Sequence, residues 1–156
     1  GVACVTADDF RWEKAHIKAV SLLAAVFSRQ ISFDAGAVET VMFRDGLLSE
    51  AAASNVWVVR GGRVLGPLKN HLVLEGIRYG LIEEMCAEAG IPFKLTSITR
   101  GEVQGADELL LTSATKEVLA VTTLDGAPVG SGRPGPVYEK LHAGYQRAKA
   151  RTAAGA

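Results

Sequence analysis

Hydrophobic and polar positions alternate with two different periods along this chain, which predicts a mixture of helices and strands. The longer segments with apolar residues at helical spacing are Val20–Ala35, Leu74–Ala89 and Val137–Arg151. The first of these helices should end at Gly36, because glycine adopts positive φ at low cost. A short helical turn is expected over Thr99–Gly105 with Thr99 as its N-cap, and the Ala/Gly tail after the last helix is expected to fray.

The remaining apolar stretches are short and are bounded by turn residues, as is typical of strands. They are Val2–Thr6, Val38–Arg44, Leu47–Ser49, Asn55–Arg60, Arg63–Leu65, Phe93–Thr96, Glu108–Thr112 and Val118–Thr123. Asp45-Gly46 and Gly61-Gly62 separate consecutive strands and predict hairpins, and Asp125-Gly126 predicts a further turn. These elements predict an α+β domain, with a curved, mostly antiparallel sheet packed against two or three long helices.

Composition limits the class of protein. With 156 residues, 48% of them hydrophobic, and zero formal net charge, the chain is expected to form a single domain over residues 1–156. Neutrality argues against nucleic acid as a partner, and no apolar run reaches membrane-spanning length. Cys4 and Cys86 lack metal-ligand spacing, and we expect them to be reduced, buried thiols in a cytoplasmic protein without a signal peptide.

Lys18 is the first candidate for chemistry. It lies where an extended segment should pass into the first helix, whose apolar stripe is expected to be buried and comprises Val20, Leu22, Leu23, Val26 and Phe27. A lysine in such a crevice loses solvation of its charged form, so its pKa falls and its amine becomes nucleophilic. The stretch by itself also allows an ordinary surface lysine. Of its neighbours, Arg11 is expected to pair with a nearby carboxylate and His16 to have no catalytic role.

Other candidates lie further along the chain. Glu50 closes a predicted strand beside three alanines and has no obvious ion-pair partner in sequence, although it could be a solvated strand-end residue. Gly76-Ile77 at a predicted helix start would place unpaired N–H groups at the positive end of the helix dipole, where phosphate groups bind. The hydroxyl-rich run of residues 112–115 breaks a strongly apolar strand, and it is either a binding turn or an ordinary one.

The order and spacing of these residues resemble a known family. The segments are Ile17-Lys18-Ala19-x-x-Leu22-Leu23, Arg44-Asp45-Gly46-x-x-x-Glu50-x-x-x-Ser54-Asn55-Val56, Glu75-Gly76-Ile77-Arg78 and Ala106-Asp107-Glu108-x-x-x-Thr112-Ser113. They look like the class IV (fold type IV) pyridoxal-phosphate aminotransferases, which include D-amino acid transaminase, branched-chain aminotransferase and aminodeoxychorismate lyase. The resemblance runs from about Val2 to Tyr145. It covers only the C-terminal half of a family member, so the N-terminal domain is expected to be absent from this chain.

The resemblance implies a function and a set of site residues. Lys18 would hold pyridoxal 5′-phosphate covalently and move the substrate proton, and Glu50 would face the pyridine nitrogen. The other residues implied in cofactor binding are Ser54, Asn55, Gly76, Ile77, Arg78, Ser113 and Ala114, and those implied in binding the substrate carboxylate are Ala114 and Thr115. No metal is expected. The expected partners are an amino acid, a 2-oxo acid and a second copy of the chain in a homodimer.

Transamination of a D-amino acid is the favoured activity, because the Thr-Ser-x-Thr-x-Glu turn and the Gly-x-Pro-Gly-Pro segment look closest to that branch. A branched-chain enzyme, the lyase, and an isolated, inactive domain remain alternatives. The chain departs from the family at two threonines that give hydroxyls to the phosphate, where Arg78 and Ala114 stand instead. Arg78 could bind the phosphate through two N–H groups, or turn outward to Glu75 or Glu83. Where the family often has Glu-Gly-Ser-Ser-Ser-Asn, this chain keeps only the last serine and the asparagine, Ser54 and Asn55, after Glu50.

Overall fold

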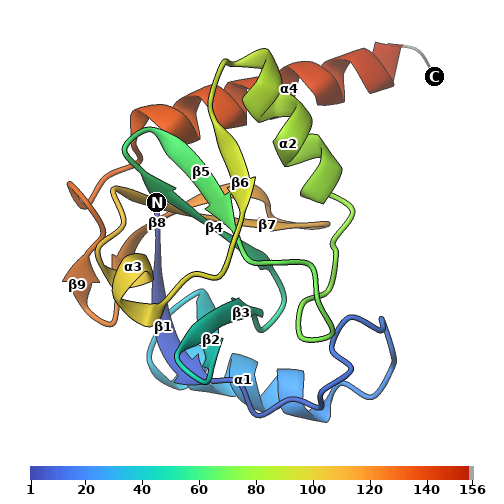
Figure 1. Cartoon of the computed structure of the whole chain (residues 1–156), viewed down its shortest axis with the longest axis vertical. Coiled ribbons are helices and arrows are strands. Elements are labelled where there is room, and N and C mark those ends of the chain that lie inside the picture. The colour runs from blue at the N-terminus through green and yellow to red at the C-terminus, as the bar shows by residue number, and fades with distance from the viewer. Residues whose placement is uncertain (155–156) are drawn as a thin grey trace.

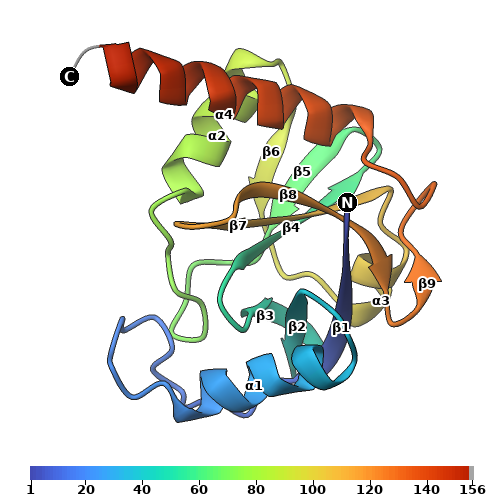
Figure 2. The same ribbon diagram turned by 180° about the vertical axis from the view of Figure 1, so that it is seen from behind.

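The computed structural model describes residues 1–154, which form a curled sheet of nine strands with helices packed on both faces (Figures 1 and 2). The strands are β1 (Val2–Asp8), β2 (Glu39–Arg44), β3 (Leu47–Ala51), β4 (Asn55–Arg60), β5 (Arg63–Gly66), β6 (Phe93–Leu95), β7 (Glu108–Ser113), β8 (Glu117–Leu124) and β9 (Ala127–Pro128). The helices are α1 (Leu23–Asp34), α2 (Tyr79–Glu88), α3 (Arg100–Gln104) and α4 (Pro136–Ala154). The predicted α+β class is confirmed.

The strands are ordered β3-β2-β1-β8-β7-β4-β5-β6, and β9 pairs with β8. The pairs β2–β3, β4–β5, β4–β7, β7–β8 and β8–β9 are antiparallel, which confirms a mostly antiparallel sheet. However, β1 runs parallel to both β2 and β8, and β5 runs parallel to β6. The sheet is therefore mixed, and α1 forms part of the crossover that joins the parallel strands β1 and β2.

The predicted turns are confirmed by their backbone angles. Asp45 has φ of 52° and Gly46 has φ of 76°, as a two-residue hairpin requires. Gly36 ends the first helix with φ of 67°. Thr99 caps α3 in a capping box with Glu102, so the N-cap read from the sequence is confirmed.

Both faces of the central strands are buried, which explains their nearly continuous apolar sequences. Val56 and Val58 of β4 pack into a core shared with β1, β2 and α3. Trp57 and Val59 point to the opposite face, into a core beneath α2 and α4. Residues that alternate along one strand thus enter two different cores.

The first helix differs from the prediction in its start and in its buried face. It begins at Leu23 rather than Val20, and the apolar stripe expected to be buried faces outward, since Val20 is 96% exposed and Phe27 is 54% exposed. The buried face instead carries Ser28 and Ser32. Their small side chains bond to carbonyl groups of their own helix, which lets α1 pack closely on β1 and β2.

The second helix also begins later than predicted, at Tyr79 rather than Leu74. The preceding residues do not join the helix because their backbone groups bond elsewhere: Leu74 donates its N–H to Glu50, and its carbonyl accepts from Asn55. Ile82 and Met85 are buried as expected, whereas Ile77 lies before the helix and is 79% exposed.

The last helix is longer than predicted. It begins at Pro136 and continues to Ala154, beyond the expected end at Arg151, while residues 155–156 of the tail expected to fray lie outside the described residues. Of the helices formed by residues 1–154, none has the length and apolar character needed to cross a membrane.

Candidate functional site

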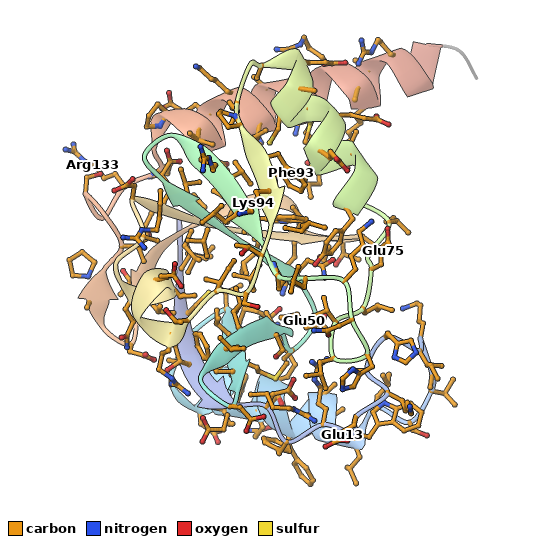
Figure 3. All side chains as sticks on the ribbon, in the orientation of Figure 1. Glu13, Glu50, Glu75, Phe93, Lys94 and Arg133 are labelled. Carbon is orange, nitrogen blue, oxygen red and sulfur yellow. The ribbon has the colours of Figure 1, made fainter. Side chains whose placement is uncertain are left out.

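Glu50 is buried in the interior, near the end of β3 (Figure 3). Its side chain is only 6% exposed, and its Oε1 accepts a hydrogen bond from Nη1 of Arg11 at 2.5 Å. Its Oε2 accepts from Nδ2 of Asn55 at 3.2 Å and from the backbone N–H of Leu74 at 3.1 Å. Burial raises the pKa of Glu50 to about 7, and the Arg11 charge limits this rise. Glu50 is therefore not a solvated strand-end residue.

Arg11 is the ion-pair partner of Glu50, which the sequence did not reveal. Its guanidinium also donates to both carboxylate oxygens of Asp9, at 2.9 and 2.8 Å, so the expected ion-pair role is confirmed. Burial by itself would raise the pKa of Asp9, but the hydrogen bonds and charge of Arg11 outweigh it and lower that pKa. Asp9 was not among the predicted residues, and only the Asp-x-Arg spacing hinted at it.

Asn55 connects Glu50 to the segment before α2. Its Nδ2 donates to Glu50 and, at 2.8 Å, to the carbonyl of Leu74. Its Oδ1 lies so close to Gly76 that a Cβ at position 76 would be 2.2 Å away. Position 76 therefore admits no side chain without displacing Asn55.

The start of α2 presents backbone donors. Arg78 occupies the N-cap position, and its side chain makes no capping hydrogen bond. The N–H groups at the start of a helix carry the positive end of its dipole. That of Tyr79 is already bonded to the carbonyl of Gly76 at 3.0 Å, whereas no described residue accepts from the N–H of Ile77 or Arg78. Gly76 and Ile77 were predicted to lie within this helix, but they precede it.

The turn between β7 and β8 presents further donors. The N–H of Lys116 bonds to Oγ of Ser113 at 3.0 Å, while Ala114 and Thr115 are exposed. The hydrogen bonds of residues 1–154 include none donated by the backbone of Ala114 or Thr115.

Arg78 connects this turn to the start of α2. Its Nε donates to the carbonyl of Ser113 at 2.6 Å, and its Nη2 donates to the carbonyl of Ala114 at 3.0 Å. Arg78 does not pair with either carboxylate considered from the sequence, since Glu75 pairs with Lys69 and the ion pairs described for residues 1–154 include none between Arg78 and Glu83. The guanidinium thus contacts backbone carbonyls rather than either of these two carboxylates.

Ser54 belongs to a buried charged cluster that the sequence did not indicate. Its Oγ donates to Glu39 at 2.9 Å, and Nζ of Lys116 contacts the same carboxylate at 2.5 Å. Nζ of Lys116 also lies 3.3 Å from Oγ of Ser54. Glu39 is fully buried, and two cations compensate its charge: Lys116, and Arg29, whose Nη1 lies 3.4 Å from Oε2 of Glu39.

Lys18 lies in the loop between β1 and α1, where it is exposed. The crevice expected at Lys18 is not formed within residues 1–154, because the helix behind it turns its apolar stripe outward. The loop itself is fastened to residues 71 and 72: the N–H of His16 donates to the carbonyl of His71 at 3.3 Å, and Arg11 donates to that of Leu72 at 3.3 Å.

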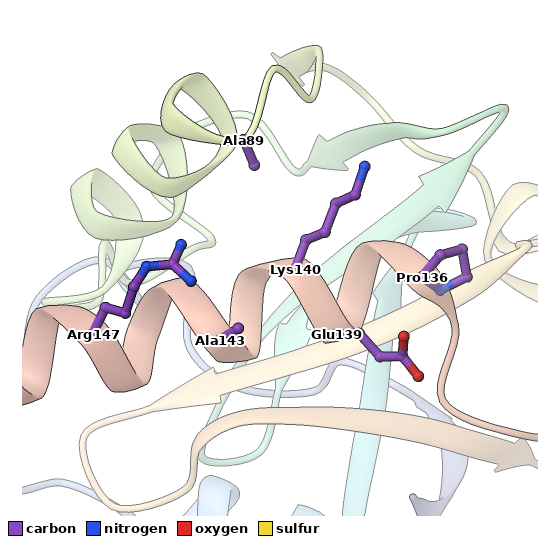
Figure 4. A pocket seen from close by; sticks show the side chains of 6 residues that line it. All are labelled: Ala89, Pro136, Glu139, Lys140, Ala143 and Arg147. Carbon is purple, nitrogen blue, oxygen red and sulfur yellow. The ribbon is translucent and has the colours of Figure 1, made fainter.

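Two hollows on the described surface are not lined by the predicted site residues. One is an open depression between the end of α2 and the side of α4 (Figure 4), lined by Ala89, Pro136, Glu139, Lys140, Ala143 and Arg147. The other, of about 120 Å³, is lined in part by Arg44, Ser49, Asn70 and Thr96. Among residues 1–154, no group of His, Cys, Asp or Glu side chains is arranged to hold a metal ion.

The structure therefore brings together two kinds of group. A buried carboxylate, Glu50, has three donors on its two oxygens, whereas a carboxylate can accept about four hydrogen bonds. The start of α2 and the turn at Ala114, joined by Arg78, supply N–H donors suited to an oxyanion. Lys18 makes no described hydrogen bond or ion pair with either group.

Comparisons with known proteins show which family this sequence and fold resemble. The sequence profile of the family "Amino-transferase class IV" matches residues 1–124. D-alanine aminotransferase of Bacillus licheniformis is 37% identical over 146 residues, which are 94% of this chain and 52% of that protein. D-alanine aminotransferase of Staphylococcus aureus (strain COL) is 32% identical over 147 residues, again 94% of this chain and 52% of that protein.

Solved structures have the same fold. The branched-chain amino acid aminotransferase from Thermobaculum terrenum in its PLP form has a TM-score of 0.88 and 21% identity, over 94% of this chain and 50% of that one. The branched-chain amino acid aminotransferase from Escherichia coli has a TM-score of 0.78 and 24% identity, over 91% and 50%. At these identities the likeness establishes the fold alone.

This chain spans about half the length of the curated relatives it matches. The family match nevertheless covers most of the chain and includes Lys18, Glu50 and the residues around Arg78. The chain belongs to the class IV aminotransferase family.

Proposed function

We propose that this chain is the cofactor-binding domain of a pyridoxal-phosphate-dependent transaminase that moves an amino group between a D-amino acid and a 2-oxo acid. The observation that carries the proposal is Glu50, a buried carboxylate with room for one more donor, close to N–H groups suited to an oxyanion. The D-alanine aminotransferases that match 94% of the chain support a D-amino acid as substrate.

The residues present fit the cofactor. Pyridoxal phosphate, when bound, supplies an electron-withdrawing ring that makes the α-proton of an amino acid easier to remove. Glu50 would accept a hydrogen bond from the ring nitrogen and keep it protonated. The N–H groups near Ile77, Arg78 and Ala114 would receive the phosphate. Asn55 would hold the backbone before α2 through the carbonyl of Leu74, and Ser54 would help to hold Lys116 at the end of the turn after β7.

Lys18 would hold the cofactor covalently through Nζ and, when its amine is free, take the α-proton from the substrate. Its exposure on the loop leaves the amine accessible. The loop is fixed at Arg11 and His16 on one side and continues into α1 on the other. Lys18 is therefore held between two anchored segments of the chain.

We infer that a further part of the protein completes the site. The chain spans about half the length of its relatives, and the loop before α1 together with α1 exposes Trp12, Val20, Leu23 and Phe27. Exposed apolar surface of this kind marks an interface. A domain preceding this one and a second copy in a homodimer would cover it and enclose Lys18.

We also infer a cytoplasmic location. Cys4 and Cys86 are both free and buried, in different cores. Reduced thiols are typical of proteins in the cytoplasm.

The proposal is tested on the purified full-length protein loaded with pyridoxal phosphate. We expect visible absorbance from the bound cofactor, a covalent adduct on Lys18 after borohydride reduction, and transfer of the amino group from D-alanine to 2-oxoglutarate. Transfer from L-leucine but not from D-alanine would replace the substrate assignment with a branched-chain one. Absence of bound cofactor and of both reactions would overturn the proposal.

Glu50→Gln separates cofactor attachment from chemistry. An amide cannot keep the ring nitrogen protonated, so we expect the covalent adduct on Lys18 to persist while turnover falls by about a hundredfold or more. Stopped-flow absorbance with D-alanine measures this rate. Unchanged turnover would show that Glu50 does not face the ring nitrogen.

A further inference from the structure

Arg78 is bound to the backbone of the turn between β7 and β8 rather than to any carboxylate. Its Nε donates to the carbonyl oxygen of Ser113 at 2.6 Å and its Nη2 donates to that of Ala114 at 3.0 Å. Its guanidinium also lies over the ring of Tyr145 in α4, 4.7 Å from the centroid. Two hydrogen bonds and a cation–π contact fix the plane of the guanidinium.

These bonds determine where two N–H groups of the turn point. No peptide bond among the described residues is cis, and in a planar trans peptide the carbonyl and the following N–H point in opposite directions. Because the carbonyls of Ser113 and Ala114 face Arg78, the N–H groups of Ala114 and Thr115 face away from it. These two residues are exposed.

The other end of the turn is held independently. The N–H of Lys116 bonds to Oγ of Ser113 at 3.0 Å, and the ammonium of Lys116 pairs with buried Glu39. Of the N–H groups in the turn, those of Ala114 and Thr115 alone have no acceptor among residues 1–154. A cation bonded to their partner carbonyls also polarises these peptide groups, which strengthens the N–H groups as donors.

From these contacts we infer that Arg78 is a positioning residue, which orients the N–H groups of Ala114 and Thr115 toward an oxyanion without touching it. This inference rests on the proposed function. It gives Arg78 a role that the threonine expected at position 78 could not perform, because threonine carries no charge. The oxyanion is either the phosphate of the cofactor or the carboxylate of the substrate.

The test compares Arg78→Met and Arg78→Lys with the unaltered full-length protein. Methionine keeps an apolar stem over Tyr145 but removes the donors, and lysine keeps the charge but cannot donate to two carbonyls in one plane. Arg133→Met is the matched control, because Arg133 is exposed and makes no described ion pair or hydrogen bond among residues 1–154. Equilibrium dialysis gives the dissociation constant of pyridoxal phosphate, calorimetry on the cofactor-free protein gives that of inorganic phosphate, and steady-state kinetics give KM and kcat for D-alanine.

Loss of two oriented donors should weaken binding of the oxyanion about tenfold to a hundredfold in Arg78→Met, and by less in Arg78→Lys. A rise in both dissociation constants assigns the N–H pair to the phosphate, and a rise in KM at unchanged kcat assigns it to the substrate carboxylate; either result supports the inference. Binding constants and KM equal to those of Arg133→Met would overturn it, as would a lowered melting temperature without any change in binding. If Arg78→Met does not fold, the comparison of Arg78→Lys with Arg133→Met decides.

The two proposals fail separately. A wild-type protein that binds no pyridoxal phosphate and transfers no amino group would overturn the proposed function. An active wild-type protein whose binding is indifferent to both Arg78 variants would overturn only the role of Arg78.

Discussion

At the scale of single residues, Glu50 makes the stability of the fold depend on pH. Its pKa rises from an ordinary value of 4.5 to about 7 because burial disfavours the charged form. Between these values the folded state binds more protons than the unfolded state, so this residue lowers stability as pH rises through that window. Asp9 acts in the opposite direction, but only below its ordinary pKa of 3.8.

Glu50→Gln should remove this part of the pH dependence. We expect the free energy of unfolding of the cofactor-free protein to fall between pH 5 and pH 7.5, and to fall less in Glu50→Gln, with the difference at most about 3 kcal/mol. Urea titrations of both proteins at the two pH values measure it. Since the other titrating groups are common to both proteins, equal slopes would mean that Glu50 titrates normally.

Lys18 provides a second prediction at this scale. Lys18→Ala should abolish covalent attachment of pyridoxal phosphate and leave the fold intact, because the side chain is exposed and makes no described contact among residues 1–154. Borohydride reduction followed by peptide mass mapping locates the adduct. Lys94→Ala, which alters another exposed lysine on β6, is the control. An adduct on Lys69 or Lys116 in the Lys18→Ala protein would contradict the assignment.

The motif residues could be found from the sequence, but their partners could not. Glu50 was singled out from its neighbours and its place in a family pattern. The pairing of Glu50 with Arg11 joins residues 39 positions apart, and it depends on β1 pairing in parallel with β2 while β2 pairs with β3. A contact of this kind follows from the order of the strands in the sheet, and that order cannot be read from Arg11 or Glu50.

At the scale of elements, Gly76 shows why α2 begins where it does. Leu74 bonds to Glu50 and Asn55 instead of entering a helix, and Asn55 occupies the space where a side chain at position 76 would lie. Helical periodicity extends over these residues in the sequence, but periodicity does not report backbone groups that are bonded to another part of the molecule. Hairpins marked by Asp-Gly and Gly-Gly were predictable because their turns are local.

Gly76→Ala and Gly80→Ala form a matched pair of substitutions. At position 76 a Cβ would lie 2.2 Å from Oδ1 of Asn55, whereas at position 80 it would meet nothing within 4 Å. We expect Gly76→Ala to destabilise the fold by about 1 to 3 kcal/mol, since Asn55 must move away from Glu50 and Leu74. Gly80→Ala should stabilise it by about 0.5 to 1 kcal/mol through helix propensity. Thermal unfolding measures both, and equal effects would mean that Asn55 moves freely.

At the scale of the whole molecule, one face remains uncovered. The loop before α1 and α1 itself lie together along one side of the fold (Figure 2), and their large apolar side chains are about half exposed or more: Phe10, Trp12, Ile17, Val20, Leu22, Leu23, Val26, Phe27 and Phe33. The sequence predicted an apolar helix face correctly, but periodicity gives only the existence of such a face and not the surface that covers it. Here the sheet packs on the serine face of α1, which leaves the apolar side exposed.

This face predicts how the isolated chain behaves in solution. Removing exposed apolar area from water is favourable by roughly 25 cal/mol per Å², so residues 1–156 by themselves should self-associate as concentration rises. Val20→Lys combined with Phe27→Glu should reduce that association, because both side chains project into solvent and charges there oppose burial. Leu68→Ser, at a half-exposed leucine outside this face, is the control and should leave association unchanged. Sedimentation velocity at several concentrations separates these outcomes. An unaltered chain that stays monomeric, or an association lost equally in the control, would mean that α1 does not form an interface.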